Sequence, residues 1–499
     1  MNNGDIMNCI VIGAGNAGRP VARLLNHVGH RVKISDGKEL KDFHTDFQRT
    51  LKIMEEEGVE LDLGQSKPDL DGFDTIYLAP SIPKTAPIYD EIAEKGLTIF
   101  TNEDFGHIAD SLINIDIIGI TGTAGKTSTT HMTGEIFKAA GYTIWLCSSI
   151  TQNLVSEVIV DGIVKGRPDE ADIAILELPH GTAGLMGELN LKIGVLVNIY
   201  DDHLSEFGGS KEKYIERKMF ITKHSESFIT SIHCKDIIKD IRKDAIFYSM
   251  AKDLPNYDES KYDDYFDKLT KGEKIAIGEN QIVNFIAGSP KKAIDIGYCY
   301  NIECGKFTSD FHMVSYYYEN GLAATAIAMT YGIDIEDIKK GLANFKGISA
   351  HMEYEGEFKG REVFFDCSFI LEGISSTLEF LSDRDLVILL DNFDTLTERD
   401  KIETGALIGK YAKVMIATGF SEITQKVEME AAYELLEGAK DSNAIKVTAG
   451  TIEEGAELCF KYSKPGDTIL HIGPQLAVDA IGVSEKIRVG LKEGMKKYD

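Results

Sequence analysis

The 499-residue sequence predicts an α/β protein of three domains, each built on a mainly parallel sheet. Short β-branched runs alternate with amphipathic helical stretches almost throughout the chain, and these runs fall into three groups. The apolar content of 43% is enough to give each domain a core. We place the boundaries in a polar turn and after a helical stretch, which gives domains of residues 1–112, 113–346 and 347–499.

The expected strands are short apolar runs bounded by Gly, Asp or Asn. In the first domain they cover residues 8–13, 31–36, 75–80 and 97–102. In the second domain they cover residues 115–122, 142–147, 171–178, 193–200 and 227–233. In the third domain they cover residues 362–368, 385–391, 413–419, 444–450 and 467–473. Residues 250–310 show poor periodicity, and we interpret them as an elaboration of the middle domain.

The composition excludes some partners. The 53 Lys and Arg against 80 Asp and Glu give a net charge of −27, which would repel nucleic acid over most of the surface. The seven cysteines are scattered, with no pairing that suggests zinc, and are expected to be thiols in a reducing compartment. No signal peptide and no run of 18 apolar residues is found, so we expect a cytoplasmic protein without a membrane partner, as a monomer or weak dimer.

A first glycine motif, VIGAGNAGRP, follows the first expected strand and precedes a helix. Its G-x-G-x-x-G spacing lets the backbone approach a diphosphate at a helix N-terminus, and an aspartate ends the next strand. The candidate nucleotide-binding residues are Gly13, Gly15, Asn16, Ala17, Gly18 and Asp36. An NAD-dependent dehydrogenase would use the same residues, and a tight strand-to-helix turn needs glycine for packing alone.

A second glycine motif, GITGTAGKTSTT at residues 119–130, again stands between an expected strand and a helix. Its loop amides and lysine suit ATP phosphates, and Thr127 offers a hydroxyl to Mg²⁺. Ile120 stands where the strict P-loop pattern has its first glycine. The candidate ATP-binding residues of the loop are Gly122, Thr123, Ala124, Gly125, Lys126, Thr127 and Ser128.

Charged residues stand at the ends of two later expected strands, 171–178 and 193–200. Glu177 ends the apolar run ADIAILEL, where a carboxylate is costly unless it meets a cation. Asp202 and His203 follow the strand after it, and Lys218 comes fifteen residues after His203. Open α/β sheets bind ligands at the carboxyl ends of their strands, so these side chains are candidates for metal and phosphate binding. The alternatives are that Glu177 is a strand-end carboxylate that faces water and that His203 is an ordinary surface residue.

These motifs together resemble the Mur ligases, the ATP-dependent enzymes that form peptide bonds in cell-wall precursors. The resemblance includes TGTAGKTSTT, Glu177, the N-x-x-x-D-H-L pattern from Asn198, Lys218, and the later segments ENGLAATAIA, FKGISAHMEYE and FFDCS, in the right order. It therefore extends over nearly the whole chain. It implies a Rossmann-like N-terminal domain for a nucleotide-linked substrate, a central P-loop ATPase domain, and a Rossmann-like C-terminal domain that completes the ATP site and binds the incoming amino acid.

The resemblance also implies roles for single residues. The catalytic residues would be Lys126, Lys218 and His203. Thr127, Glu177, His203 and Lys218, the last carbamylated by CO₂, would hold Mg²⁺. Asn320 and Asp366 would contact ATP. His351 stands where many relatives carry a phosphate-binding arginine, but an imidazole, unlike a guanidinium, is not permanently charged and does not have forked donors.

The implied reaction joins an amino acid to a UDP-type nucleotide-linked peptide through an acyl phosphate, with ADP as a product. The first domain resembles that of the alanine- and D-glutamate-adding enzymes. The acceptor side departs from the D-glutamate enzyme, since CSFIL follows Asp366 and Val478 replaces a hydroxyl. We therefore favour an archaeal pseudomurein peptide ligase, with a bacterial D-glutamate-adding type ligase and a dehydrogenase as alternatives.

Overall fold

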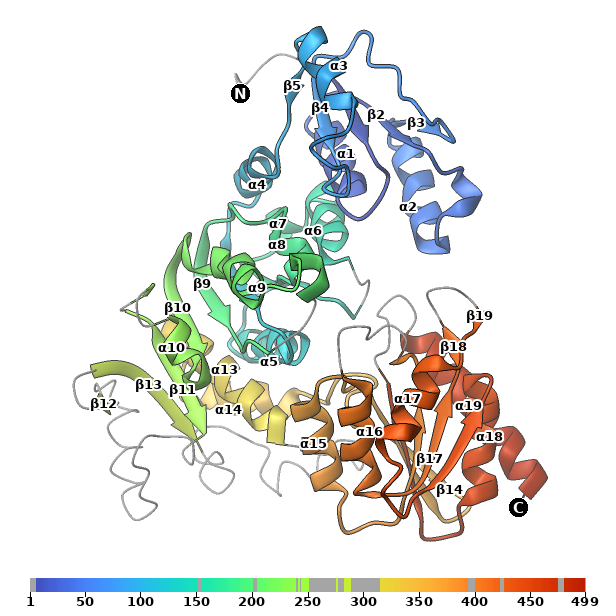
Figure 1. Cartoon of the computed structure of the whole chain (residues 1–499). Helices are drawn as coiled ribbons and strands as arrows, with labels where there is room; N and C mark the ends of the chain where they lie inside the picture. The colour runs from blue at the N-terminus through green and yellow to red at the C-terminus, as the bar shows by residue number, and fades with distance from the viewer. Residues whose placement is uncertain are drawn as a thin grey trace. The chain divides into compact units, whose positions relative to one another are not determined.

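The computed structural model describes residues 6–150, 154–200, 204–238, 241–242, 244–250, 275–276, 282–288, 315–393, 400–421, 426–473 and 480–498. These residues form an α/β fold with mainly parallel sheets, which confirms the predicted fold class (Figure 1). The chain divides into two compact units. The first comprises Met1–Thr121, Tyr142–Gly194 and Arg217–Glu226, and the second comprises Gly122–Gly141, Val195–Glu216 and Ser227–Asp499.

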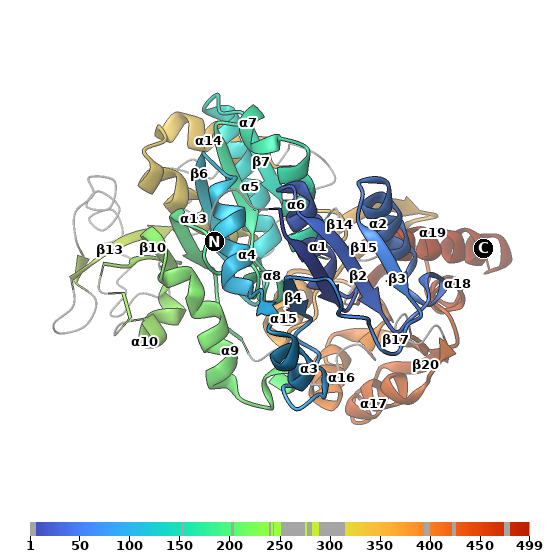
Figure 2. The ribbon, with the colours of Figure 1, turned by 90° about the horizontal axis from the view of Figure 1, so that it is seen from above.

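The first sheet has five parallel strands in the order β3-β2-β1-β4-β5, a Rossmann-like arrangement. Its strands are β1 (Asn8–Ile12), β2 (Arg31–Asp36), β3 (Glu60–Leu63), β4 (Thr75–Leu78) and β5 (Thr98–Ile99). The connecting helices are α1 (Gly18–His27), α2 (Thr45–Glu56), α3 (Ile88–Lys95) and α4 (Asn102–Ser111), with a 3₁₀ turn η1 (Leu40–Asp42). Helix α1 lies beside β2 (Figure 2), and its apolar face covers the centre of the sheet.

The second sheet has eight strands in the order β12-β13-β11-β10-β9-β6-β8-β7. The strands are β6 (Asp116–Thr121), β7 (Ile144–Cys147), β8 (Ile173–Glu177), β9 (Leu191–Leu196), β10 (Ser225–Ser231), β11 (Ile246–Met250), β12 (Ile275–Ala276) and β13 (Ile282–Gly288). Pairs β6–β8 and β7–β8 are parallel, as are β10–β11 and β11–β13, whereas β12–β13 is antiparallel. The buried, β-branched strands explain why these runs read as continuous apolar segments in the sequence.

The segments between these strands are mostly helical. They are α5 (Lys126–Ala139), α6 (Val155–Val164), α7 (Arg167–Glu170), α8 (His180–Ala183), α9 (Lys211–Lys218), α10 (Lys235–Ile238), α13 (Ser315–Tyr331) and α14 (Ile335–Asn344), with 3₁₀ turns η2 (Leu204–Phe207), η3 (Met219–Thr222) and η4 (Ile232–Cys234). Both α13 and α14 pack against α5, which directly follows the second glycine motif.

The third sheet has six strands in the order β14-β15-β21-β16-β17-β20, parallel except for the β14–β15 pair. Its strands are β14 (Glu353–Phe358), β15 (Arg361–Asp366), β16 (Leu386–Leu390), β17 (Ala412–Thr418), β20 (Ile445–Ala449) and β21 (Thr468–Ile472), and a small ribbon pairs β18 (Phe420–Ser421) with β19 (Lys426–Val427). Its helices are α15 (Leu371–Phe380), α16 (Lys401–Gly409), α17 (Glu430–Gly438), α18 (Ile452–Tyr462) and α19 (Ala480–Tyr498).

Two further properties concern the described part of the chain as a whole. None of the helices there has both the length and the hydropathy needed to cross a bilayer. The cysteines there, namely Cys9, Cys147, Cys234, Cys367 and Cys459, are free thiols.

Candidate active site

The loop between β6 and α5 carries the second glycine motif. Gly125 is the N-cap of α5 with a φ of +76°, a left-handed conformation that glycine adopts without strain. The Asn198 side chain holds the loop from the side, because its Oδ1 accepts hydrogen bonds from the Thr123 and Ala124 amides at 3.1 and 2.9 Å. The Lys126 Nζ donates to the Thr123 carbonyl at 2.8 Å. The first turn of α5, with Thr127 and Ser128, thus supplies the amide donors of a helix N-terminus.

A second asparagine lies directly against this loop. Asn320 on α13 is only 3% exposed, and its Nδ2 has no hydrogen-bond partner among the residues that the structure describes. A Cβ atom on Gly125 would lie 2.3 Å from the Asn320 Oδ1, so the glycine is needed for this close approach. A buried amide without a partner is unfavourable on its own, and a ligand at the loop would relieve this cost. The structure therefore brings Asn320 to the second glycine loop from almost 200 residues further along the chain.

Glu177 ends β8 at the carboxyl edge of the sheet and is 1% exposed. It pairs in register with Ile120, two residues before the glycine loop. Its carboxylate accepts hydrogen bonds from the Ser149 amide at 2.9 Å and from the Ser149 hydroxyl at 3.1 Å. Lys218, the last residue of α9, is equally buried at 1% exposed. His203 lies outside the described residues.

Asp366 ends β15 in the third sheet and is 1% exposed. Its Oδ1 accepts hydrogen bonds from the Met352 amide at 3.3 Å and from the Tyr316 hydroxyl at 3.5 Å. Its Oδ2 accepts from the Ser368 hydroxyl at 2.7 Å and from the Thr377 hydroxyl. Burial raises the pKa of Asp366 above its usual range, although the bonds from Thr377 and Ser368 oppose that shift.

His351 lies next to this aspartate. Its Nε2 is 3.2 Å from the Cys367 Sγ, and its Nδ1 is 3.0 Å from the Ser349 carbonyl oxygen. Because a carbonyl only accepts, Nδ1 donates to it, and Nε2 lies within hydrogen-bonding distance of the thiol. Ala350 and Met352 on either side have φ values of +59° and +50°, a strained conformation for residues with a Cβ. This arrangement holds the ring in one orientation.

His131 on α5 is a further histidine that the sequence analysis did not single out. Burial lowers its pKa to about 4, and the positive charges of Lys138 and His351 act in the same direction. The ring is therefore neutral at pH 7. In the sequence it is a single histidine on a helix, which gives no signal of its electrostatic coupling to His351.

The first glycine motif forms the turn between β1 and α1. A Cβ on Gly18 would lie 1.8 Å from the Gly13 carbonyl oxygen, so the helix can pack this closely only with glycine. The Asp36 carboxylate accepts hydrogen bonds from the Ala14 amide at 2.7 Å and from the Lys38 amide at 2.9 Å, and so fixes the turn. The tip, which consists of Gly15, Asn16 and Ala17, is exposed or half-buried.

Arg19 directly follows this motif and is fully buried. Its Nε donates to the Glu157 carboxylate at 2.5 Å, and its guanidinium stacks 3.5 Å from the Phe47 ring centroid. The neighbouring Arg23 binds Asp161 at 2.9 Å. These two ion pairs join α1 to α6 within the first unit.

Comparison with known proteins identifies the class. The profile of the Mur ligase middle domain matches residues 120–287. An uncharacterized protein of Methanothermobacter thermautotrophicus is 41% identical over 217 residues, which is 43% of this chain and 69% of that protein. The UDP-N-acetylmuramoylalanine–D-glutamate ligase of Enterococcus hirae is 26% identical over 486 residues, covering 94% of this chain and 91% of that enzyme.

A pseudomurein peptide ligase type C from Methanothermus fervidus shares the fold, with a TM-score of 0.56, 20% identity, and coverage of 96% of this chain and all of that one. The matches in sequence define a ligase that forms carbon–nitrogen bonds. Residues 120–287 thus match the middle domain of the Mur ligase family, whose members use ATP and Mg²⁺, and ligases of that family match over more than nine tenths of the chain. These matches favour the ligase hypothesis over the dehydrogenase.

Proposed function

We propose that the chain is an ATP-dependent, ADP-forming ligase that joins an amino acid to a UDP-linked peptide precursor of murein or pseudomurein in the cytoplasm. The observation that supports this most directly is the phosphate loop, in which Gly125 and Lys126 begin α5 and the buried Asn320 lies against the loop. The domain ranges 1–112, 113–346 and 347–499 and the monomer or weak dimer remain part of this proposal.

The reaction needs two anions to meet. A substrate carboxylate oxygen attacks the γ-phosphorus of ATP, the bond to the bridging oxygen breaks, and ADP leaves. The amine of the second substrate, after loss of a proton, then attacks the acyl phosphate carbonyl and displaces inorganic phosphate. Lys126 and the amides of the α5 N-terminus would offset the charge of the phosphates during the first step.

The residues fit a hard divalent cation. Glu177 is a buried carboxylate that accepts hydrogen bonds from Ser149, and carboxylate oxygens are ligands that Mg²⁺ prefers. With the Thr127 hydroxyl it would hold Mg²⁺, which when bound would neutralise the phosphates of ATP. Lys218 is buried to 1% exposure, and a carbamate formed there with CO₂, as the resemblance to the Mur ligases implies, would replace its positive charge by oxygen ligands.

The choice between murein and pseudomurein depends on the acceptor pocket. The D-glutamate enzymes match over more than nine tenths of the chain, and the pseudomurein ligase of Methanothermus fervidus matches in fold over a similar length. The segment after Asp366 reads Cys367-Ser368-Phe369-Ile370, without the lysine of the D-glutamate enzyme. We favour the pseudomurein branch because a pocket without that cation would bind a glutamate carboxylate poorly. Val478, the other departure, lies outside the described residues.

The test is phosphate release from ATP with a panel of amino acids and UDP-linked acceptors. We expect one acceptor and amino acid pair to stimulate release and to yield an amide product by mass spectrometry. In Lys126→Ala, kcat should fall on the order of 100- to 1000-fold. Lys138→Ala is the matched control, since Lys138 is an exposed lysine on the same helix that pairs with Glu135 at 2.7 Å. Equal turnover in both variants would contradict the assignment.

A further inference from the structure

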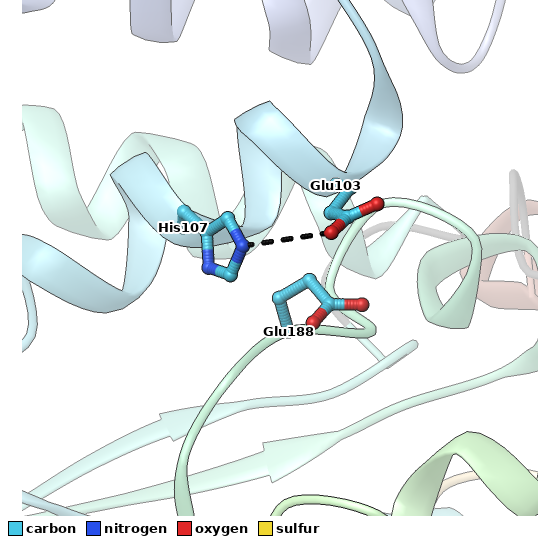
Figure 3. Close-up of side chains that lie close together, drawn as sticks. All are labelled: Glu103, His107 and Glu188. Atoms are coloured by element: carbon cyan, nitrogen blue, oxygen red, sulfur yellow. Dashed lines mark ion pairs between the residues drawn. The ribbon is translucent and has the colours of Figure 1, made fainter. Parts of the chain in front are cut away.

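Three side chains that could hold a metal ion lie on helix α4 and on a segment beside it. Glu103 and His107 are one helical turn apart, and Glu188 faces them from the segment between α8 and β9 (Figure 3). Each side chain offers one ligand atom, and these three atoms all lie within 4.8 Å of one another. The His107 Nε2 and the Glu103 Oε1 are 3.9 Å apart. This spacing is compatible with one ion shared by all three.

The two segments are fixed against each other by contacts outside the ligand group. The Asp110 carboxylate accepts hydrogen bonds from the Asn190 backbone amide at 2.8 Å and from the Asn190 side chain at 2.6 Å. A Cβ atom on Gly106 would lie 2.9 Å from the Glu188 Cβ, so α4 approaches this segment as closely as a glycine permits. The three side chains therefore meet on a backbone that is already assembled.

A second histidine completes the group. His224 directly precedes β10, and its Nε2 is 3.1 Å from the Glu188 Oε2. His224 and Glu188 are 35% and 26% exposed, whereas Glu103 and His107 on the helix are 72% and 60% exposed. The group thus contains two imidazoles and two carboxylates from three segments, open to solvent on one side. His224 is placed to orient Glu188, as partners of metal ligands commonly do.

We propose that Glu103, His107 and Glu188, with His224 behind them, bind a divalent transition-metal ion of the Zn²⁺ type. Imidazole nitrogen with carboxylate oxygen suits Zn²⁺, Co²⁺ and Ni²⁺, whereas Mg²⁺ prefers oxygen ligands alone. The net charge of −27 also favours cation binding. These residues differ from those assigned to Mg²⁺ in the proposed reaction, so the two sites are independent.

The bound ion would act as a cross-link. Helix α4 follows the last strand of the first sheet, whereas Glu188 precedes β9 and His224 directly precedes β10 of the second sheet. All four residues belong to the first compact unit. A ligand that binds only the folded chain stabilises it in proportion to the logarithm of its concentration over Kd. The ion should therefore raise the unfolding temperature of the protein without being required for phosphate release.

The experiment uses the full, tag-free chain after treatment with a chelator. Zn²⁺ is titrated against a chromophoric chelator in the presence of millimolar Mg²⁺, and Co²⁺ is added separately to record its visible absorption. We expect one equivalent of Zn²⁺ to bind, a Co²⁺ band typical of nitrogen and oxygen ligands, and a higher unfolding temperature with Zn²⁺.

The double variant Glu103→Gln/His107→Gln removes two exposed ligands from the helix surface and should fold normally, which circular dichroism will verify. Its Zn²⁺ affinity should fall at least tenfold, and the Zn²⁺-induced rise in unfolding temperature should disappear. His27→Gln is the matched control, because His27 is an exposed histidine at the end of α1. Equal Zn²⁺ affinity in the wild type and the double variant would overturn the proposal, as would a loss of equal size in the control.

Discussion

The contact between Gly125 and Asn320 gives a prediction whose size follows from the structure. An alanine at position 125 would keep a φ of +76°, which costs about 1–2 kcal/mol for a residue with a Cβ. The added methyl group would also lie 2.3 Å from the Asn320 Oδ1, and overpacking of this kind costs about 1–3 kcal/mol. If the loop keeps its conformation, Gly125→Ala lowers stability by about 2–5 kcal/mol.

If the loop instead changes conformation, the strain is relieved and the amides at the α5 N-terminus are misplaced for phosphate. ATP affinity then falls by a comparable free energy, where each factor of ten corresponds to about 1.4 kcal/mol. The assay therefore measures both the unfolding temperature without nucleotide and the Kd of an ATP analogue by calorimetry. Wild-type values for both quantities would refute the reasoning.

A double-mutant cycle separates the two contributions. Asn320→Ala removes the atom that the new methyl group would meet, so only the backbone cost of about 1–2 kcal/mol should remain for Gly125→Ala in that background. The unfolding temperature of the double variant should then exceed the value expected from adding the two single changes. An additive result would show that the side chains of positions 125 and 320 do not meet.

Two more predictions concern ionisable groups. Glu177→Gln should keep the hydrogen bonds from Ser149 but remove a negative charge. The Mg²⁺ concentration for half-maximal phosphate release should therefore rise at least tenfold. An unchanged Mg²⁺ requirement would show that Glu177 does not bind the metal. The folded chain lowers the pKa of His131 to about 4, whereas the pKa in the unfolded chain is about 6.5. Between these two values the unfolded chain binds more protons than the folded one, so stability is lost as the pH falls from about 6.5 to 4. At pH 5 this loss is about 2 kcal/mol, and His131→Gln should show a smaller drop in unfolding temperature between pH 8 and pH 5 than the wild type. An identical drop in both proteins would contradict the buried, neutral state of His131.

Much of the fold was predictable because the buried strands are short, β-branched and bounded by turn residues. Each expected strand overlaps one that the structure shows, for example residues 385–391 with β16 (Leu386–Leu390). The strands that the sequence analysis missed in the described residues include β3, with the sequence ELDL, and β14, with the sequence EYEGEF. Both lie at sheet edges with half-exposed side chains, so acidic residues are tolerated and the apolar signal is lost.

The candidate site was predictable where its residues are neighbours in the sequence, as in the loop from Gly122 to Ser128. Contacts between distant segments were not predictable from local patterns. Asn198 bonds the loop through its side chain, and Cys367 bonds His351, yet neither pairing leaves a spacing signal. His131 gave none either, because its pKa depends on burial that only the folded chain creates. The binding and catalytic roles of all these site residues, Lys218 and Asp366 included, stay predictions.

The buried Arg19–Glu157 pair bears on how the enzyme could move. Separating α1 from α6 would leave a buried guanidinium and a buried carboxylate without their partners, which costs several kcal/mol. The turn that carries the first glycine motif leads into α1, so this turn is fixed to α6 and the two should move as one body. Any hinge that admits and releases substrates has to bend elsewhere along the polypeptide.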